Sequence, residues 1–298
     1  MADHVRGAGS LGMDSLGGRY RLLEKIGAGS MAVVHRAFDE FLEREVAVKL
    51  IDSTAVDEAE LRRSDAEVKL LARLSHPGLV TLLDAGTEWG AEGTSRIFLV
   101  MELVTGPDLR ARLKEGPLPP ARVAEIGHDL AEALGYIHGK GVVHRDIKPA
   151  NILLLDEAVN GTRAHAKLTD FGIALMTESV LTLEDAVSGT PAYLSPEQVR
   201  GDTASPASDV YSLGLVLLQC LTGELAFPGA PLESAVRRLT QNPPIPESVD
   251  PLWRDLVVGM TALEPAQRLT AVEAAASLYR LAALGAVSDL APLSVQPS

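Results

Sequence analysis

Cysteine is almost absent from this chain, since Cys220 is the single one among 298 residues. One cysteine excludes an intrachain disulfide, and a chain without disulfides is typical of a reducing compartment. We therefore predict a cytoplasmic protein. Cys220 itself is better explained as a small buried hydrophobic residue than as a reactive thiol.

Long apolar runs are also missing. No stretch reaches the ~18 apolar residues that a membrane-spanning helix requires, and residues 1–19 lack the apolar segment of a signal peptide. We predict no membrane span in this chain. Residues 1–18 contain five glycines and few large apolar side chains, which indicates a disordered N-terminal arm.

Basic residues are fewer than acidic residues in this chain. The chain has 27 lysines and arginines against 40 acidic residues, a formal net charge of −13. A general binder of the phosphate backbone needs a basic surface, so we exclude nucleic acid as a partner. The apolar content of 46% is enough for one large core or two modest lobes.

The most informative motif is a polar loop followed later by an acidic tripeptide, His144-Arg145-Asp146-Ile147-Lys148-Pro149-Ala150-Asn151 and Asp170-Phe171-Gly172. Apolar runs flank the first segment, so its polar residues lie in a loop with buried anchors. Asp146 can accept the proton of an incoming hydroxyl, and Lys148 can neutralise charge on a phosphoryl group. Asn151 and Asp170 offer oxygens to a metal ion. Phosphoryl transfer from a magnesium nucleotide requires these parts.

A glycine-rich turn occurs earlier in the chain, Gly27-Ala28-Gly29-Ser30-Met31-Ala32. Taken alone it also fits a dinucleotide-binding fingerprint, with Asp52 near the distance of a ribose-binding acid. A dinucleotide fold needs a helix to open after the turn. Residues 31–38 instead favour a returning strand, which makes a hairpin over phosphates. Lys49, in an otherwise apolar strand, is then placed to reach the α- and β-phosphates.

Residues 60–74 have the periodicity of an amphipathic helix without internal glycine or proline. Glu67 lies on its apolar side and can turn toward the sheet to pair with Lys49. Helix periodicity alone does not separate Glu67 from Glu60 and Asp65.

The composition shifts at Thr105-Gly106-Pro107, where we predict the boundary between two lobes. Asp108 then opens a short helix as its N-cap and is also a candidate to bind a ribose. Residues 209–221 form a nearly all-apolar helix, which we expect to be buried, with Asp209 holding the backbone of the polar loop.

The last predicted helix begins at a capping box, Thr270-Ala271-Val272-Glu273, and ends near Leu284. Residues 285–298 have no periodicity and are expected to form a tail.

With these motifs the chain resembles the protein kinase superfamily, and within it the bacterial eukaryotic-type (Hanks-type) serine/threonine kinases, over about residues 19–284. The matching positions of the two lobes include Gly27, Gly29, Val34, Lys49, Glu67, Met101, Glu102, Val104, Asp146, Lys148, Asn151 and Asp170. Residues 188–197 match the end of an activation segment, in which Glu197 is expected to pair with Arg268.

The chain departs from the family pattern at two positions. Ala32 stands at the third glycine of the glycine-rich loop, and Ser195 replaces the alanine of Ala-Pro-Glu. Neither change removes an essential charge. Lys148 together with Thr190 follows the serine/threonine pattern of the family, so the resemblance implies a serine or threonine acceptor.

The resemblance implies an α+β, bilobal protein-kinase fold, with a small β-rich N-lobe that carries one regulatory helix and a larger, mostly α-helical C-lobe. The expected divisions are a disordered N-terminal arm, the N-lobe, the C-lobe and a C-terminal tail, at residues 1–18, 19–104, 105–284 and 285–298. It also implies ATP and Mg²⁺ as cofactors, with Mn²⁺ as an alternative metal, and proteins with Ser or Thr as substrates.

The site residues that the resemblance implies fall into three groups. Asp146, Lys148, Lys49 and Glu67 are expected to act in catalysis, and Asn151 and Asp170 to bind the metal. The expected nucleotide-binding residues are Gly27, Ala28, Gly29, Ser30, Val34, Ala47, Lys49, Met101, Glu102, Val104, Asp108 and Asn151. A catalytically silent scaffold with a kinase fold is the alternative, but it would be free to lose the catalytic and metal residues, and all of them are present.

We expect regulation in the segment between Asp170 and Glu197. Family members carry regulatory phosphothreonines there, which makes Thr182 the first candidate, with Thr190 nearby. A phosphate on Thr182 could pair with Arg145. Glu184 either supplies part of that charge permanently or is a solvated loop acid. Autophosphorylation in trans would require a transient homodimer.

Overall fold

The computed structural model describes residues 15–28, 32–53, 72–89, 95–155, 165–170 and 191–288. The chain divides into a β-rich unit, Met1–Leu61 with Leu82–Leu103, and a helical unit, Arg62–Thr81 with Val104–Ser298. A β-rich part followed by a mostly helical part confirms the predicted fold class. The break after Leu103 lies one residue before the predicted lobe boundary.

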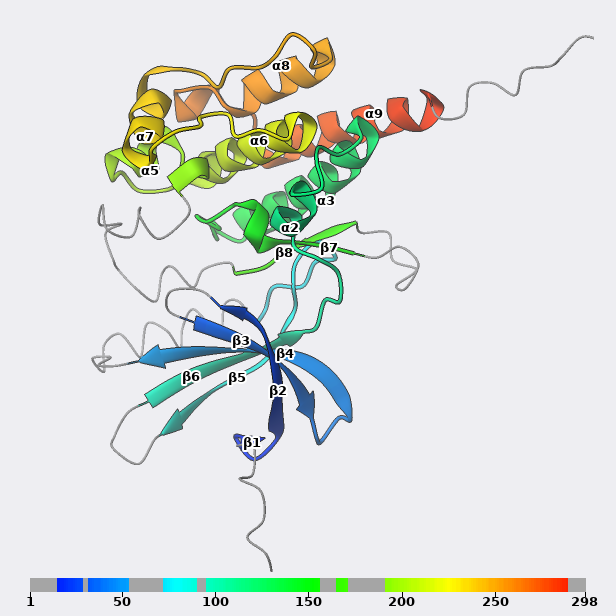
Figure 1. The fold of residues 1–298 in the computed structure, drawn as a ribbon, viewed down its shortest axis with the longest axis vertical. Coiled ribbons are helices and arrows are strands. Elements are labelled where there is room, and N and C mark those ends of the chain that lie inside the picture. Colours follow the sequence, from blue (N-terminus) through cyan, green and yellow to red (C-terminus); the bar gives the residue numbers. More distant parts are fainter. Residues whose placement is uncertain are drawn as a thin grey trace, which may run out of the picture. The chain divides into compact units, whose positions relative to one another are not determined.

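The β-rich unit is one antiparallel sheet of six strands in the order β1-β2-β3-β4-β6-β5 (Figure 1). The strands are β1 (Ser15–Leu16), β2 (Tyr20–Ala28), β3 (Ala32–Asp39), β4 (Arg44–Ser53), β5 (Leu82–Trp89) and β6 (Ser95–Glu102). One face packs a core in which β4 contributes Val46, Val48 and Leu50, two residues apart along the strand. Tyr20 from β2 and Phe98 from β6 also belong to this core.

The N-terminal part of this sheet corrects one prediction. We expected a disordered arm through residue 18, but Ser15 and Leu16 pair with Arg21 and Tyr20 as strand β1. Leu16 is 2% exposed and belongs to the core. The burial of Leu16 accounts for the order of residues 15 and 16, which the glycine content of the stretch did not indicate.

The helical unit contains seven α-helices among its described residues. They are α2 (Leu109–Leu113), α3 (Pro120–His138), α5 (Pro196–Arg200), α6 (Pro206–Thr222), α7 (Pro231–Thr240), α8 (Pro251–Met260) and α9 (Ala271–Ser288). Helix α6 is buried on several faces, as predicted, and it packs against α3, α8 and α9. Helix α3 lies along α9 (Figure 1).

The start of α9 confirms the prediction, and its end corrects it. The capping box is present, since Glu273 N donates to Thr270 Oγ1 (3.2 Å) and Thr270 N donates to Glu273 Oε2 (2.8 Å). The helix runs to Ser288 rather than ending near Leu284. Gly285 does not adopt the left-handed conformation that ends many helices, and the next proline is Pro292, so the backbone does not stop the helix at Leu284.

A small two-stranded sheet, β7 (Ile152–Leu154) with β8 (Ala166–Leu168), follows α3 in the chain. The loop before β5 joins this sheet, because Val80 N donates to Leu168 O (2.8 Å) and Leu168 N to Gly78 O (2.9 Å). These bonds explain why the described residues just before Leu82 group with the helical unit, although we predicted them in the N-lobe.

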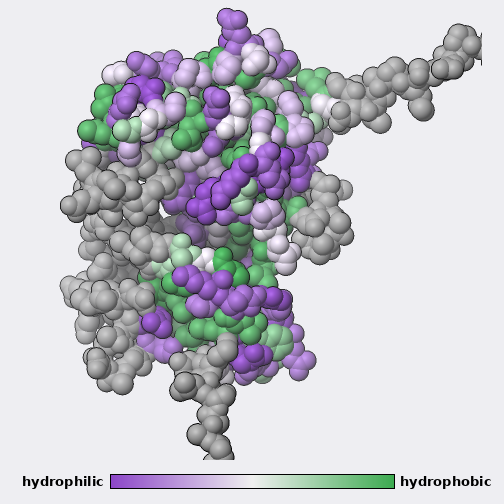
Figure 2. All heavy atoms as spheres, viewed as in Figure 1, coloured by the Kyte–Doolittle hydropathy of each residue, from purple (hydrophilic) through white to green (hydrophobic). Residues whose placement is uncertain are grey.

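Polar and charged residues cover much of the described surface, with apolar residues between them (Figure 2). None of the helices in the described part of the chain is both long enough and apolar enough to span a membrane. Cys220 is buried in α6, and burial raises the pKa of its thiol to about 12. Its predicted role as a small core residue is confirmed.

Candidate active site

The helical unit brings together three of the predicted catalytic and metal residues. Lys148 Nζ lies 2.7 Å from Asp146 Oδ2, and Asn151 Nδ2 donates to the same oxygen at 2.9 Å. Asn151 Nδ2 also donates to the backbone oxygen of Asp146 (2.8 Å). The Asp146 side chain keeps 39% of its surface exposed, so its carboxylate is held in place and still accessible to a hydroxyl group.

The amide of Asn151 can serve a metal only through its oxygen. Both bonds to Asp146 use Nδ2, which leaves Oδ1 directed elsewhere. Thr169 N donates to Asn151 O (3.0 Å), so Asp170 follows directly on a segment bonded to Asn151. Oxygen donors from one amide and one carboxylate suit Mg²⁺, which completes its shell with water and substrate phosphates.

Two residues of this region have left-handed backbone conformations. Arg145 has φ 70° and Asp170 has φ 63°, an uncommon state for residues with a Cβ. Such strain persists where the surroundings over-determine it, and it is frequent at functional sites. Phe171 and Gly172 lie outside the described residues.

Asp209 holds the backbone of the polar loop at residues 144–151, called the catalytic loop from here on, as predicted. Its Oδ2 accepts from His144 N and its Oδ1 from Arg145 N, both at 2.8 Å. A third bond, 2.8 Å long, joins Oδ2 to His138 Nε2 on α3. The first two bonds fix the loop to α6, and the third holds Asp209 against α3.

His144 is fully buried beneath the loop, with its ring bonded at both nitrogens. Nε2 lies 3.1 Å from Thr169 O, and Asp146 N donates to Nδ1 at 3.3 Å. Since a carbonyl can only accept and an amide can only donate, the neutral ring with hydrogen on Nε2 satisfies both bonds. His144 therefore positions Asp146.

The β-rich unit places five predicted nucleotide-binding residues on one face. Directly opposed residues of neighbouring strands share a face of the sheet, as do residues two apart on one strand. The register pairs Gly27 with Val34, Val34 with Lys49, and Ala47 with Met101. This face is opposite the one that carries Val46, Val48 and Leu50. Lys49 is 7% exposed.

The strand after the glycine-rich turn decides between the two interpretations of that turn, a hairpin over phosphates and a dinucleotide-binding fingerprint. Residues 29–31, including Gly29 and Ser30, lie outside the described part, but β3 begins at Ala32 and pairs with both β2 and β4. A dinucleotide fingerprint needs a helix at this point. The dinucleotide reading is therefore wrong. Glu67 also lies outside the described residues, so its pairing with Lys49 stays a prediction.

Asp108 is confirmed as the N-cap of α2. Its Oδ1 accepts from Ala111 N (2.6 Å), and its Oδ2 lies 3.4 Å from Arg110 Nη2. The predicted contact with a ribose stays a prediction, as do those of Glu102, at the end of β6, and Val104.

Glu197 and Arg268 form the predicted ion pair, which is bidentate and buried. The two bonds from Arg268 measure 2.7 and 2.8 Å, and Ser208 Oγ donates to Glu197 Oε1 (2.6 Å). Burial alone would raise the pKa of Glu197, but the bonds from Arg268 and Ser208 outweigh it and lower this pKa to about 2. The Arg268 guanidinium also stacks on the Tyr211 ring, 4.8 Å from its centroid.

One positioning residue was missed at the sequence level. Gln198 Nε2 donates to Arg145 O (2.9 Å), which connects α5 to the catalytic loop. The same side chain closes a capping box, because its Oε1 accepts from Ser195 N (3.0 Å) and its backbone N donates to Ser195 Oγ (3.4 Å). The pattern Ser-x-x-Gln could have indicated this cap. It also explains the serine that replaces the alanine of Ala-Pro-Glu.

The predicted regulatory residues are only partly described. Thr182, Glu184 and Thr190 lie outside the described residues. Arg145 is described, and its Nε is buried without a hydrogen-bond partner among the described residues.

Comparison with known proteins gives one family match, Protein kinase domain, over residues 20–280. Serine/threonine-protein kinase PknL of Mycobacterium tuberculosis is 39% identical over 261 residues, which are 85% of this chain and 63% of that protein. Serine/threonine-protein kinase PrkC of Bacillus subtilis is 36% identical over 87% of this chain and 39% of its own length. PknB of Mycobacterium leprae is 39% identical over 89% and 43%. The chain thus spans less than two thirds of these relatives.

Proposed function

Since the chain belongs to the protein kinase domain family, we propose that it is a serine/threonine protein kinase that transfers the γ-phosphate of ATP to hydroxyl groups of proteins. The arrangement of Asp146, Lys148 and Asn151 carries this proposal. A scaffold without activity would have no use for a half-exposed carboxylate held between a cation and an amide.

Asp146 accepts the proton of the substrate hydroxyl, and Lys148 neutralises charge on the transferred phosphoryl group. Oδ1 of Asn151 and the carboxylate of Asp170 would hold Mg²⁺, or Mn²⁺ in its place. The metal, when bound, neutralises phosphate charge. His144 and Asp209 keep the loop in position throughout.

The β-rich unit contributes the nucleotide contacts. Gly27, Val34 and Ala47 offer backbone and small apolar side chains to ATP, and Lys49 on the same face binds its α- and β-phosphates. Glu67 is the partner of Lys49 in the active state. Lys148 with Thr190 supports serine and threonine as acceptors.

The substitution Asp146→Asn tests the proposal. It keeps the size of the side chain but removes the base, so we expect phosphate incorporation into a Ser/Thr substrate protein to fall about 10²–10⁴-fold. The matched control is Asp255→Asn, the same change at an exposed position of α8, which should leave the rate unchanged. A near-normal rate in Asp146→Asn with an intact circular dichroism spectrum would favour the scaffold.

We also propose that the kinase phosphorylates Thr182 on a second copy of itself through a transient homodimer. A phosphate of about −1.5 to −2 charge at Thr182 can pair with Arg145 and order the segment. Glu184 would provide part of this charge beforehand and sustain basal activity.

Two variants separate these roles after phosphatase treatment. Thr182→Ala should abolish the activation that follows incubation with ATP, and Glu184→Ala should lower the basal rate. Activation that survives in Thr182→Ala would move the switch to Thr177, Ser179, Ser188 or Thr190. A basal rate untouched by Glu184→Ala would leave that residue as a solvated loop acid.

A further inference from the structure

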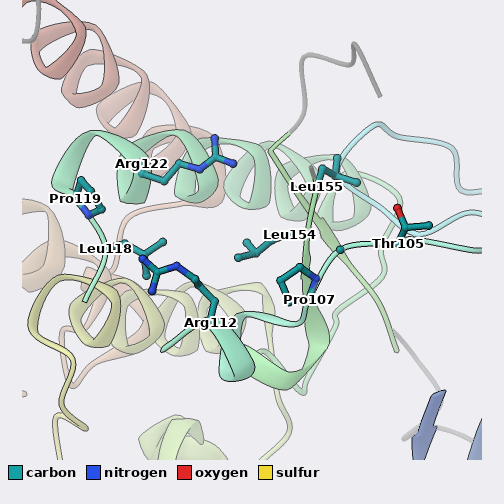
Figure 3. A pocket seen from close by; sticks show the side chains of 9 residues that line it. Thr105, Pro107, Arg112, Leu118, Pro119, Arg122, Leu154 and Leu155 are labelled. Carbon is teal, nitrogen blue, oxygen red and sulfur yellow. The ribbon is translucent and has the colours of Figure 1, made fainter. Parts of the chain in front are cut away.

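The helical unit contains a cavity of about 370 Å³ that none of the proposed catalytic roles uses. Its lining comes from the chain just after the lobe boundary, from α2, from the start of α3 and from the end of β7 (Figure 3). This volume lies toward the lower end of the range for small-molecule sites.

The floor of the cavity is apolar and held in place by the backbone. Pro107, Leu118 and Leu154 contribute side chains to it. Leu154 N donates to Pro107 O (2.9 Å), and Leu118 N donates to Cys220 O (2.8 Å). A Cβ at Gly106 would lie 1.7 Å from Leu154 O, so the two segments touch along their backbones. The floor of the cavity is therefore formed before a ligand binds, and this preorganisation lowers the free-energy cost of binding.

The polar side chains among the described lining residues are Thr105 and two arginines, Arg112 and Arg122. In Figure 3, Arg122 extends from α3 above and Arg112 from α2 below, with Leu118 and Leu154 between them. None of the described residues that line the cavity is acidic. The first turn of α3 likewise contains no acidic residue and has no side-chain cap, so the positive end of its dipole adds to the same field.

Among the described residues, the acidic neighbours of these arginines are on the surface, and Arg112 Nη1 also donates to Gly116 O (3.2 Å). Glu115 Oε2 lies 3.8 Å from Arg112 Nε, and Glu125 Oε2 lies 3.1 Å from Arg122 Nη1. Their side chains are 74% and 39% exposed. Exposed ion pairs of this kind contribute only ~0–1 kcal/mol. A ligand carboxylate or phosphate can therefore compete with these two exposed carboxylates for the guanidinium groups.

We infer that the cavity binds a small amphipathic anion, a carboxylate or phosphate group on a compact apolar body. The guanidinium groups receive the anion in the forked geometry that suits both groups, and the leucine and proline side chains cover the apolar body. The inference is independent of phosphoryl transfer and can be tested without nucleotide.

Calorimetric titration of the full chain with octanoate tests the inference. We expect saturable binding, with acetate and octan-1-ol each at least roughly tenfold weaker, because one lacks the apolar body and the other the charge. Octyl phosphate in a parallel titration shows which anionic group is preferred. Equal affinity for octan-1-ol would overturn the inference. An acidic Glu-Leu peptide that displaced octanoate at a concentration below that of octanoate would overturn it as well, because the site would then prefer a peptide.

Substitutions locate the binding. Arg112→Gln and Arg122→Gln should each weaken octanoate roughly tenfold, and Arg112→Lys, which keeps the charge but loses the fork, should weaken it less. Arg110→Gln is the matched control, on the same helix, with a side chain 68% exposed and outside the cavity. Unchanged affinity in both glutamine variants would overturn the assignment.

Amide hydrogen exchange of the unsubstituted protein gives a second readout that requires no variant to fold. Octanoate should slow exchange of the Leu154 N–H, since this group bonds to Pro107 across the floor of the cavity. Binding without added protection at Leu154 would place the ligand elsewhere.

Discussion

Glu197 illustrates how single side chains join distant parts of this chain. Its carboxylate accepts two bonds from Arg268 and one from Ser208, and all three groups are buried. A buried ion pair contributes little net stability against an apolar replacement, but removal of one partner leaves an uncompensated charge and costs ~3–5 kcal/mol. The pair therefore fixes α5 against α6 and the segment before α9.

The lowered pKa of Glu197 predicts a specific loss of stability in acid. Its pKa is about 2 when folded against an ordinary value of 4.5. The stabilisation is complete above about pH 4.5 and is lost as the pH falls toward 2, with a total on the order of 3 kcal/mol. Urea unfolding at a series of pH values should show this slope.

The variant Glu197→Gln should be less stable at neutral pH and should flatten the slope between pH 4.5 and 2. Glu247→Gln, the same change at an exposed position, is the matched control. A slope that persists unchanged in Glu197→Gln would assign the acid sensitivity to other carboxylates.

At the scale of elements, α6 is the support of the catalytic loop. Asp209 near its start is 1% exposed and uses both oxygens for bonds to the loop backbone and to His138. Because the loop has no regular structure between His144 and Lys148, these bonds replace the ones that a helix or sheet would provide.

The substitution Asp209→Asn should disturb this support. An amide offers one acceptor instead of two, so either His144 N or Arg145 N faces a second donor and loses its bond. We expect about 1–3 kcal/mol less stability in urea unfolding, together with a fall in phosphoryl transfer. Asp202→Asn at an exposed position is the control and should be neutral. Normal stability and a normal rate in Asp209→Asn would show that the loop keeps its conformation without the bonds from Asp209.

Local patterns in the sequence predicted the strands around Lys49, the helices α2, α6 and α9, and the residues of the catalytic loop. The strands around Lys49, the cap at Asp108 and the capping box at Thr270 depend on neighbours within a few residues, which a sequence displays directly. The shared face of Gly27 and Lys49 depends on strand register, and the bond from Gln198 depends on tertiary packing. The spacing of residues along the sequence indicates neither the strand register nor the tertiary packing.

The whole molecule carries a net charge of −13, which acts beyond any single contact. A negative field attracts basic partners and repels acidic ones, and salt screens it over a Debye length of about 10 Å at 0.1 M. The field of the proposed kinase should therefore favour the approach of basic substrate segments over acidic ones before either reaches the catalytic loop.

We predict that kcat/KM for a Ser/Thr peptide flanked by lysines falls roughly tenfold from low to high salt. The same peptide flanked by glutamates should show no fall, because screening relieves its repulsion. Steady-state assays over a salt series measure both. The same salt dependence for the two peptides would mean that the field of the molecule does not steer substrates.

Strand β1 has a practical consequence for cloning. The family match begins at residue 20, but the folded sheet begins at Ser15, and Leu16 is part of its core. An expression fragment cut at the match boundary would delete that leucine and the strand that pairs with Tyr20 and Arg21 at the edge of β2. Fragments for crystallisation or assay should therefore start upstream of Ser15, and sequence similarity alone would set their boundary in the wrong place.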